Sequence, residues 1–429
     1  MTGGAQKPAA GARTDRGNAW GRWFPLAGAT LAILVLAPFL GVLQEHVRES
    51  VGLGYLRWVS GGLAAAGAAA LVSAVVRIRR FRLRRYGLLL AAGLLVALQV
   101  GAWGVGEEET DVLERVHLLE YGVLAVLFVR AFRPGHGGPF LPVLALLGVA
   151  LVGLADETVQ WLTPVRVGDF RDVVLNAYAG LVGVLFVLAL RGPRPLPADG
   201  ETGTTGGGAL RRGFRPRGPQ SQTAARGTAA GRSLRLSAGL GAVVVLAGAA
   251  FFDAAHLGHE IRDPEAGVFL SWHSPEELRR AADERAERWS RESIPPHRPL
   301  AREDYFLSEA GWHANERNHA VRVGDLRRAW RENRILERWY QPYLEVRGGW
   351  PERQRAKIER ELEARDPAAL EASPGYRSPA LEGRVVAAPP RPFLWGGAVL
   401  AAGALLAVAR GRGSAGPGRP GMFAKEELS

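Results

Sequence analysis

The sequence predicts an all-α, polytopic membrane helix bundle of about eight spans that carries a mainly helical extracytoplasmic domain. Three observations lead to this fold class. Of the 429 residues, 47% are hydrophobic and 22% charged, and the apolar residues gather in blocks of about twenty, the length that crosses a bilayer core. Arginines cluster in short segments beside these blocks. A long polar stretch separates the last two blocks.

The apolar blocks define the expected domain organisation. They run approximately over residues 24–43, 59–76, 86–105, 112–132, 139–155, 173–190, 234–252 and 393–408. We therefore expect a tail (1–23), a six-span module (24–190), a linker (191–232), a seventh span (233–252), an extracytoplasmic domain (253–392), an eighth span (393–410) and a second tail (411–429). The linker is rich in Gly, Thr, Arg and Pro and lacks apolar periodicity, so we expect it to be disordered.

The charge distribution predicts the orientation of the spans. The N-terminal tail, the loop Arg77–Arg85 and the linker are rich in arginine, whereas the loop Gly106–Asp111 is acidic. Under the positive-inside rule this alternation places both termini in the cytoplasm of a multi-pass cell-membrane protein. The same rule accounts for the net charge of +12, so this charge does not indicate nucleic-acid binding. The sequence also contains no nucleic-acid-binding signature. Cysteine is absent, which excludes disulfides and thiolate chemistry.

Polar residues in three segments interrupt the apolar pattern of the six-span module. The first segment enters span four, the second leaves span five and the third enters span six, so all three are predicted at the outer face. Together they give the candidate functional cluster: Glu114, Arg115, His117, Glu120, Tyr121, Asp156, Glu157, Gln160, Arg166, Asp169, Asp172 and Asn176.

Helical spacing groups these side chains. Glu114, His117 and Glu120 are three residues apart and share a broad helix face. Glu120 is expected about 12 Å along span four, where an ionised carboxylate costs on the order of 3 kcal/mol and requires a polar partner. Asp172 shares a face with Asn176, as i and i+4 residues do. Arg166 is the nearest positive charge to these carboxylates. Asp169 and Asp172 are favourable at the N-terminus of span six, where the helix dipole is positive.

The order and spacing of these motifs resemble the VanZ-like family over residues of about 85–190. The matching residues are Arg115, His117, Tyr121, Asp156, Glu157, Gln160, Pro164, Arg166, Asp172, Asn176, Gly180 and Gly183. The sequence departs from the family pattern at Val159, often His, and at Val165, often Gly. Members are bacterial multi-span membrane proteins, and the founding member is linked to low-level resistance to teicoplanin, a glycopeptide that binds cell-wall precursors. The resemblance implies a location and a process but no reaction.

Two functions fit the cluster. The first is binding of a lipid-linked precursor, lipid or amphiphilic drug at the outer leaflet, with an effect on glycopeptide susceptibility. The second is a membrane enzyme on a lipid-linked substrate, in which Glu157 or Glu120 acts as general base, His117 as proton shuttle and Arg166 as anion clamp. The alternative to both is a buried polar network that fixes helix packing, as Gly180 and Gly183 are expected to do. A transporter is disfavoured, because the charges collect at one face.

No cofactor or metal site is expected. His117, Glu157 and Asp172 have suitable ligand types without a metal-binding spacing, and residues 256–260 (HLGHE) are expected to be interfacial.

The outer domain is expected to be helical. Ser274, Pro275 and Glu277 form a capping-box signature for a helix to about Arg291. A second helical stretch begins near Arg302, Gly324-Asp325 divides a helical hairpin, and a last helix covers 351–365. Aromatic residues are expected to form its core: Trp312, Trp330, Trp339, Tyr340 and Tyr343. Its expected partner is the bundle, another envelope protein or wall material.

Overall fold

The computed structural model describes residues 14–80, 82–102, 108–133, 140–163, 168–191, 219–291, 304–387 and 390–411. The chain divides into two compact units. The first, here called the membrane module, comprises Met1–Asp156, Arg171–Ala247 and Ala398–Ser429. The second, here called the C-terminal module, comprises Glu157–Phe170 and Gly248–Gly397. The second unit therefore includes a short segment from the predicted six-span region.

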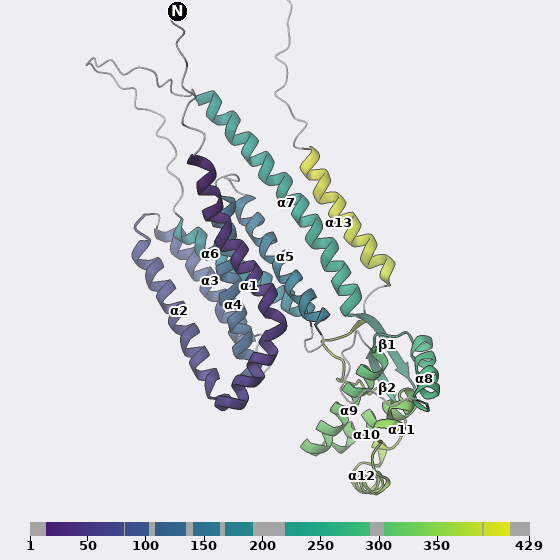
Figure 1. The fold of residues 1–429 in the computed structure, drawn as a ribbon. Coiled ribbons are helices and arrows are strands. Elements are labelled where there is room, and N and C mark those ends of the chain that lie inside the picture. Colours follow the sequence, from purple (N-terminus) through teal and green to yellow (C-terminus); the bar gives the residue numbers. More distant parts are fainter. Residues whose placement is uncertain are drawn as a thin grey trace, which may run out of the picture. The chain divides into compact units, whose positions relative to one another are not determined.

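Long helices make up the membrane module (Figure 1). Seven described helices are long and apolar enough to cross a membrane, and α4 has the length but carries Arg115, Glu120 and Arg130. In chain order the helices are α1 (Thr14–Val51), η1 (Gly52–Gly54), α2 (Tyr55–Arg77), α3 (Arg82–Ala102), α4 (Glu108–Phe132), α5 (Phe140–Leu162), α6 (Phe170–Leu190), α7 (Pro219–Ala255) and α13 (Arg391–Gly411). The polytopic fold class expected from the sequence is confirmed.

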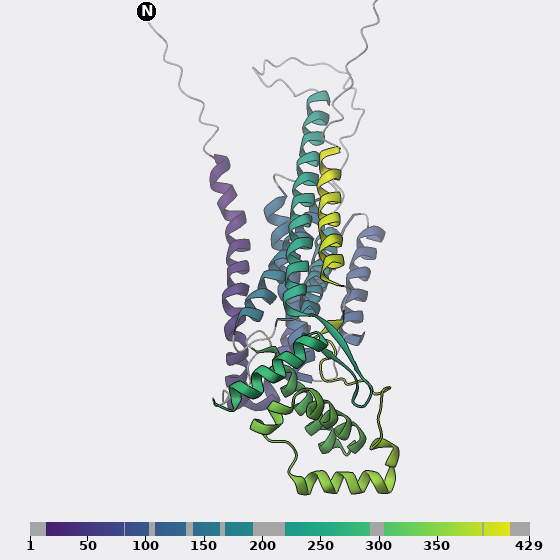
Figure 2. The same cartoon turned by 90° about the vertical axis from the view of Figure 1, so that its right-hand side faces the viewer.

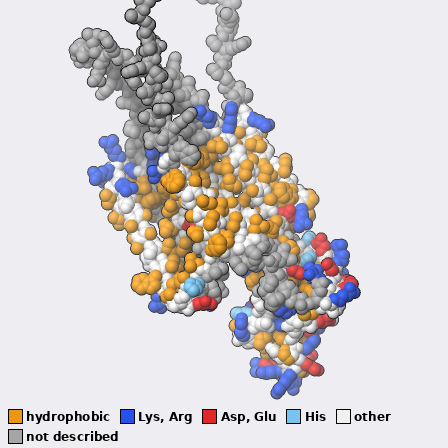
Figure 3. Space-filling model, viewed as in Figure 1, with side chains coloured by type: hydrophobic (Ala, Val, Ile, Leu, Met, Phe, Trp, Pro, Cys, Tyr) orange, Lys and Arg blue, Asp and Glu red, His pale blue; other side chains and the backbone are white. Residues whose placement is uncertain are grey.

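Many large apolar side chains of these helices are exposed. Leu31 is 63% exposed, Trp58 82% and Leu400 75%. Figure 3 shows hydrophobic side chains covering the helices of this module, whereas charged side chains gather on the C-terminal module. Apolar exposure on this scale marks surfaces that contact lipid or a partner.

Small residues bring the helices of the membrane module into close contact. A Cβ atom at Gly183 of α6 would collide with the backbone carbonyl of Gly122 on α4, and one at Gly180 would collide with Val149 on α5. Both positions were expected to be close packing sites, and the structure confirms this. Around them lies the apolar core of the module, built from α1, α4, α5 and α6.

One arginine of the basic loop has a structural partner. Arg85 is 7% exposed and donates hydrogen bonds to the carbonyl oxygens of Ala189 and Leu190 at the end of α6. The last carbonyls of a helix have no intrahelical donor and carry partial negative charge, so a guanidinium stabilises them.

Helix α7 is longer than expected. It begins at Pro219, inside the predicted disordered linker 191–232, of which residues 192–218 lie outside the described part of the chain. Pro at the first helical position and the Ala-, Gln- and Arg-containing sequence that follows favour a helix. Farther along, Gly241 lies against Leu405 of α13, and both views show the two helices side by side (Figures 1 and 2).

The C-terminal module is helical with a small sheet that the sequence analysis did not predict. The helices are α8 (Pro275–Trp289), α9 (Tyr305–Val323), α10 (Leu326–Trp339), α11 (Gln341–Arg347), α12 (Glu352–Arg365) and η2 (Pro367–Ala369). The strands β1 (Leu257–Asp263), β2 (Gly267–Ser271) and β3 (Val386–Ala387) form a sheet of order β2-β1-β3. β1 is antiparallel to β2, with Ile261 opposite Phe269, and parallel to β3.

The helix boundaries follow the local signals. At the start of α8, Ser274 and Glu277 form the expected capping box. Gly324 ends α9 with φ of 80°, a left-handed conformation that favours glycine, and the Asp325 side chain caps α10. Of the predicted core aromatics, Trp330, Trp339 and Tyr340 are buried, whereas Tyr343 and Trp312 pack against apolar clusters from partly buried positions.

Candidate functional site

Within the membrane module, a buried hydrogen bond joins α4 to α5. The Tyr121 hydroxyl donates to Oδ2 of Asp156 over 2.7 Å, and the two residues are 0% and 3% exposed. A hydrogen bond to a carboxylate in an apolar interior is strong, because water does not compete for it. Tyr121 therefore holds Asp156 in place, as a member of the predicted cluster.

The other predicted residues of α4 lie closer to the surface. His117 Nδ1 is 3.8 Å from Glu120 Oε2, and the two side chains are 25% and 31% exposed. Arg115 is partly buried. The side chain of Glu114 and the whole of Arg166 lie outside the described residues. His117 and Glu120 thus share a face, as predicted from their spacing.

Asn176 of α6 is the most unusual polar side chain of the module. It is 0% exposed, and neither its amide nitrogen nor its amide oxygen has a hydrogen-bond partner among the described residues. A Cβ atom at Gly153 of α5 would lie 2.9 Å from the Cβ of Asn176, so the glycine makes room for this amide. A buried unpaired polar group costs about 1–3 kcal/mol. The amide therefore retains one donor group and one acceptor without a partner among the described residues.

Asp172, one turn before Asn176, has a different environment. It lies in the first turn of α6, 3.9 Å from the Arg171 guanidinium, and its side chain is 34% exposed. Asp169 directly precedes the helix, as predicted for carboxylates that interact with its positive end.

Glu157 follows Asp156 on α5 and belongs to the C-terminal module. It is 0% exposed, its Oε2 accepts the backbone N–H of Asp169 over 3.0 Å, and its Oε1 accepts Nε2 of Gln160 over 3.3 Å. The carboxylate thus fixes the chain segment that leads into α6. Glu157, Gln160 and Asp169 were all predicted site residues, and the structure brings them together.

His256, at the end of α7, joins this group. Its Nε2 accepts the backbone N–H of Phe170 over 2.9 Å and lies 4.0 Å from Oδ1 of Asp169. Its Nδ1 is 2.8 Å from the carbonyl oxygen of Arg384. Because a carbonyl can only accept and the Phe170 N–H can only donate, the ring proton is on Nδ1 in this arrangement. His256 therefore uses both nitrogens to link three separate chain segments.

Arg384 places a cation at the same location. Its guanidinium lies 3.9 Å from the centroid of the Trp312 ring. Burial lowers the pKa of Arg384, and the charge of Asp169 opposes this effect. A guanidinium stacked on an aromatic face is preorganised for anions.

Sequence reasoning missed His256 and Arg384 as members of the site. His256 lies 86 residues from Phe170 and 128 from Arg384, and no local pattern connects them. Among the residues that the structure describes, no group of three or more His, Cys, Asp or Glu is placed to hold a metal ion.

Comparison with known proteins assigns part of the chain. Residues 68–191 match the VanZ/LLP1 family model, which confirms the resemblance and extends it toward the N-terminus. No family model matches the rest of the C-terminal module, outside residues 68–191. No curated protein and no solved structure matches the chain. The protein is thus a membrane protein with a VanZ-like region followed by a module without a recognised family.

Proposed function

We propose that this VanZ-like membrane protein acts in the bacterial cell envelope, where it binds a lipid-linked, lipid or amphiphilic ligand at the outer face of the cell membrane and affects susceptibility to teicoplanin. The single observation that carries the proposal is the buried, unpaired amide of Asn176. Its neighbourhood includes Gly153, one turn before Asp156 on α5. A polar ligand group that bonds this amide removes a cost that the folded protein otherwise retains.

The proposed orientation is supported by the charge distribution. Arginines gather at the N-terminus, in Arg77–Arg85 and after α13, whereas the α3–α4 loop is acidic. This alternation favours cytoplasmic termini and an outer location for the polar cluster and for the C-terminal module.

The contacts of Glu157 and His256 favour binding over catalysis. Both carboxylate oxygens of Glu157 accept hydrogen bonds, and both ring nitrogens of His256 bond to the backbone. A general base needs a lone pair within reach of the substrate proton. The partly exposed pair His117 and Glu120 is better suited to proton transfer and defines the enzymatic alternative.

The proposal is tested by teicoplanin susceptibility in a sensitive bacterial host. Cells would express wild type, Glu157→Ala, Glu157→Gln or empty vector at matched membrane levels. We expect wild type to raise resistance, Glu157→Ala to lose it, and Glu157→Gln to keep it, because glutamine retains an acceptor oxygen for the Asp169 N–H. Loss with Glu120→Gln at unchanged protein level would support the enzyme instead. Equal susceptibility of wild type and empty vector would contradict the proposal.

A further inference from the structure

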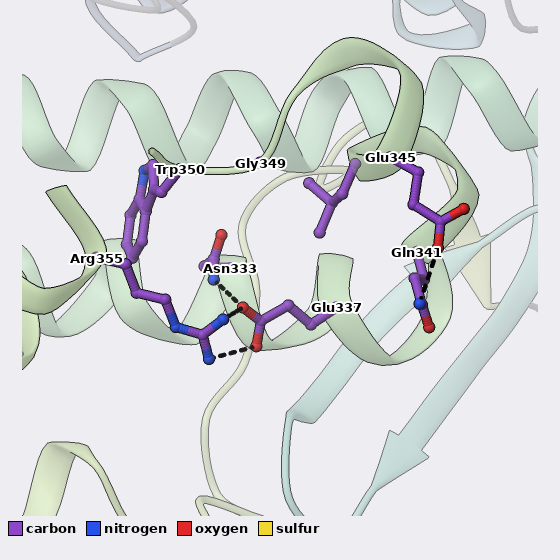
Figure 4. A pocket seen from close by; sticks show the side chains of 8 residues that line it. Asn333, Glu337, Gln341, Glu345, Gly349, Trp350 and Arg355 are labelled. Atoms are coloured by element: carbon purple, nitrogen blue, oxygen red, sulfur yellow. Dashed lines mark hydrogen bonds and ion pairs between the residues drawn. The ribbon is translucent and has the colours of Figure 1, made fainter. Parts of the chain in front are cut away.

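A cavity in the C-terminal module has the lining of a ligand site. Its volume is about 400 Å³, within the range of small-molecule sites. α10 contributes Asn333 and Glu337, α11 contributes Gln341, Leu344 and Glu345, and Gly349, Trp350 and Arg355 complete the lining. Figure 4 shows Trp350 and Arg355 at one end, Gln341 and Glu345 at the other, and Asn333 and Glu337 between them.

An aromatic ring forms one wall. Trp350 lies 6.3 Å from Trp330 between ring centroids, and the Arg317 guanidinium is 5.5 Å from the Trp350 ring centroid. These neighbours hold the indole in a fixed orientation. Its Nε1 is buried and has no hydrogen-bond partner among the described residues. The wall therefore combines an apolar surface with a donor that needs an acceptor.

The polar side chains of the cavity form hydrogen-bonded pairs. Arg355 lies 2.8 Å from Glu337 Oε1, Asn333 Nδ2 donates to Glu337 over 2.7 Å, and Gln341 Nε2 donates to Glu345 over 2.9 Å. Behind them, Arg317 is bonded to Asn333 Oδ1 over 3.1 Å. The contacts with Asn333 and Arg355 hold the Glu337 carboxylate at the cavity, whereas the Gln341–Glu345 pair is exposed.

The charge balance restricts the ligand class. The lining carries the carboxylates of Glu337 and Glu345 and the guanidinium of Arg355, which pairs with Glu337. The Arg317 guanidinium lies outside the lining, over the Trp350 ring. A cation meets Arg355 and an anion meets the glutamates, so neither is favoured. A neutral ring with one apolar face and several hydroxyl groups fits both the Trp350 ring and the polar side chains, because hydroxyls both donate and accept.

We propose that this cavity is a binding site for an uncharged pyranose ring of a carbohydrate. The CH face of the ring packs on Trp350, and its hydroxyl or acetamido groups bond to Glu345, Gln341 and the indole N–H. The site is independent of the Asn176 and Glu157 cluster, so either proposal can fail alone.

The test is calorimetric titration of the purified full chain in a detergent without a sugar headgroup. The neutral probes are tri-N-acetylchitotriose and maltotriose, and the charged probes are the glucosamine trisaccharide and glucuronic acid. We expect saturable binding of at least one neutral probe and weaker binding of the charged ones. Glu345→Gln and Trp350→Phe should each weaken binding about tenfold, the effect of losing one hydrogen bond of about 1.4 kcal/mol.

The matched control is Glu363→Gln, an exposed position of α12 outside the cavity lining, which should bind like wild type. Thermal unfolding of each variant checks that it is folded. Failure of both neutral probes to bind, stronger binding of a charged probe, or unchanged binding by both cavity variants would overturn the proposal.

Discussion

Two buried polar side chains, one from each module, differ in how far their hydrogen bonds are satisfied. In the C-terminal module, Glu309 is 0% exposed and accepts hydrogen bonds from the Ser271 hydroxyl, the Trp272 backbone N–H and the Tyr340 hydroxyl over 2.9, 2.7 and 2.6 Å. In the membrane module, Asn176 is equally buried and has no partner among the described residues. A saturated buried group fixes the fold, whereas an unsaturated one in an otherwise well-packed bundle points to a ligand or water.

The largest expected effect on stability is at Glu309, whose carboxylate has its hydrogen bonds satisfied. Glu309→Leu should destabilise the C-terminal module by about 3–5 kcal/mol, because it leaves the hydroxyl of Tyr340 and the N–H of Trp272 buried without an acceptor. Limited proteolysis of the full chain measures this. Ser271→Ala, which removes one donor, should cost about 1 kcal/mol. Equal proteolysis rates for the two variants would show that saturation of Glu309 does not stabilise the module.

A smaller effect is expected at the close helix contact. Gly183→Ala should destabilise the membrane module by about 1–3 kcal/mol, since the new methyl group collides with the backbone of Gly122. Gly93→Ala on α3 is the matched control, because a Cβ atom there meets no atom within 4 Å. Thermal unfolding in detergent compares the two. A lower melting temperature for the control than for Gly183→Ala would contradict the packing account.

The smallest effect concerns pH. His273 Nδ1 is 3.3 Å from Glu309 Oε1. Burial lowers the pKa of His273, but the hydrogen bond and charge of Glu309, together with the charges of Glu277 and Asp304, raise it above the usual value of 6.5. The contribution of this pair is therefore complete below pH 6.5 and is lost as the pH rises through the raised value. The melting temperature of wild type should fall over that window more than that of His273→Gln. Parallel pH profiles would contradict this assignment.

Local signals predicted much of the fold. The apolar blocks predicted the spans, and the capping box at Ser274 and the turn at Gly324 placed helix ends correctly, because each depends on neighbouring residues. The spacing of His117 and Glu120, and the closeness of helices at Gly183, also followed from helical geometry. The three-stranded sheet was missed, since β1 and β3 are distant in sequence and β3 has two residues.

The candidate site was predicted only in part. Its acidic residues stood out because charges are rare in apolar segments. The contribution of His256 could not be foreseen, because its bonds to Phe170 and to Arg384 depend on tertiary structure. The absence of a partner for Asn176 likewise follows from how α5 and α6 pack at Gly153. Sequence patterns identify polar residues whose burial costs free energy, but only the packing shows whether their hydrogen bonds are satisfied.

The account is tested most directly by Asn176→Leu, which replaces the unpaired amide by an apolar side chain of similar size. Teicoplanin susceptibility and thermal stability would be measured together, with wild type and Leu119→Ala, an exposed position on α4, at matched membrane levels. We predict that Asn176→Leu is as stable as wild type or more stable, because an unsatisfied polar group is removed, and that it loses resistance while Leu119→Ala keeps it. Full resistance with Asn176→Leu would contradict the claim that this amide binds the ligand.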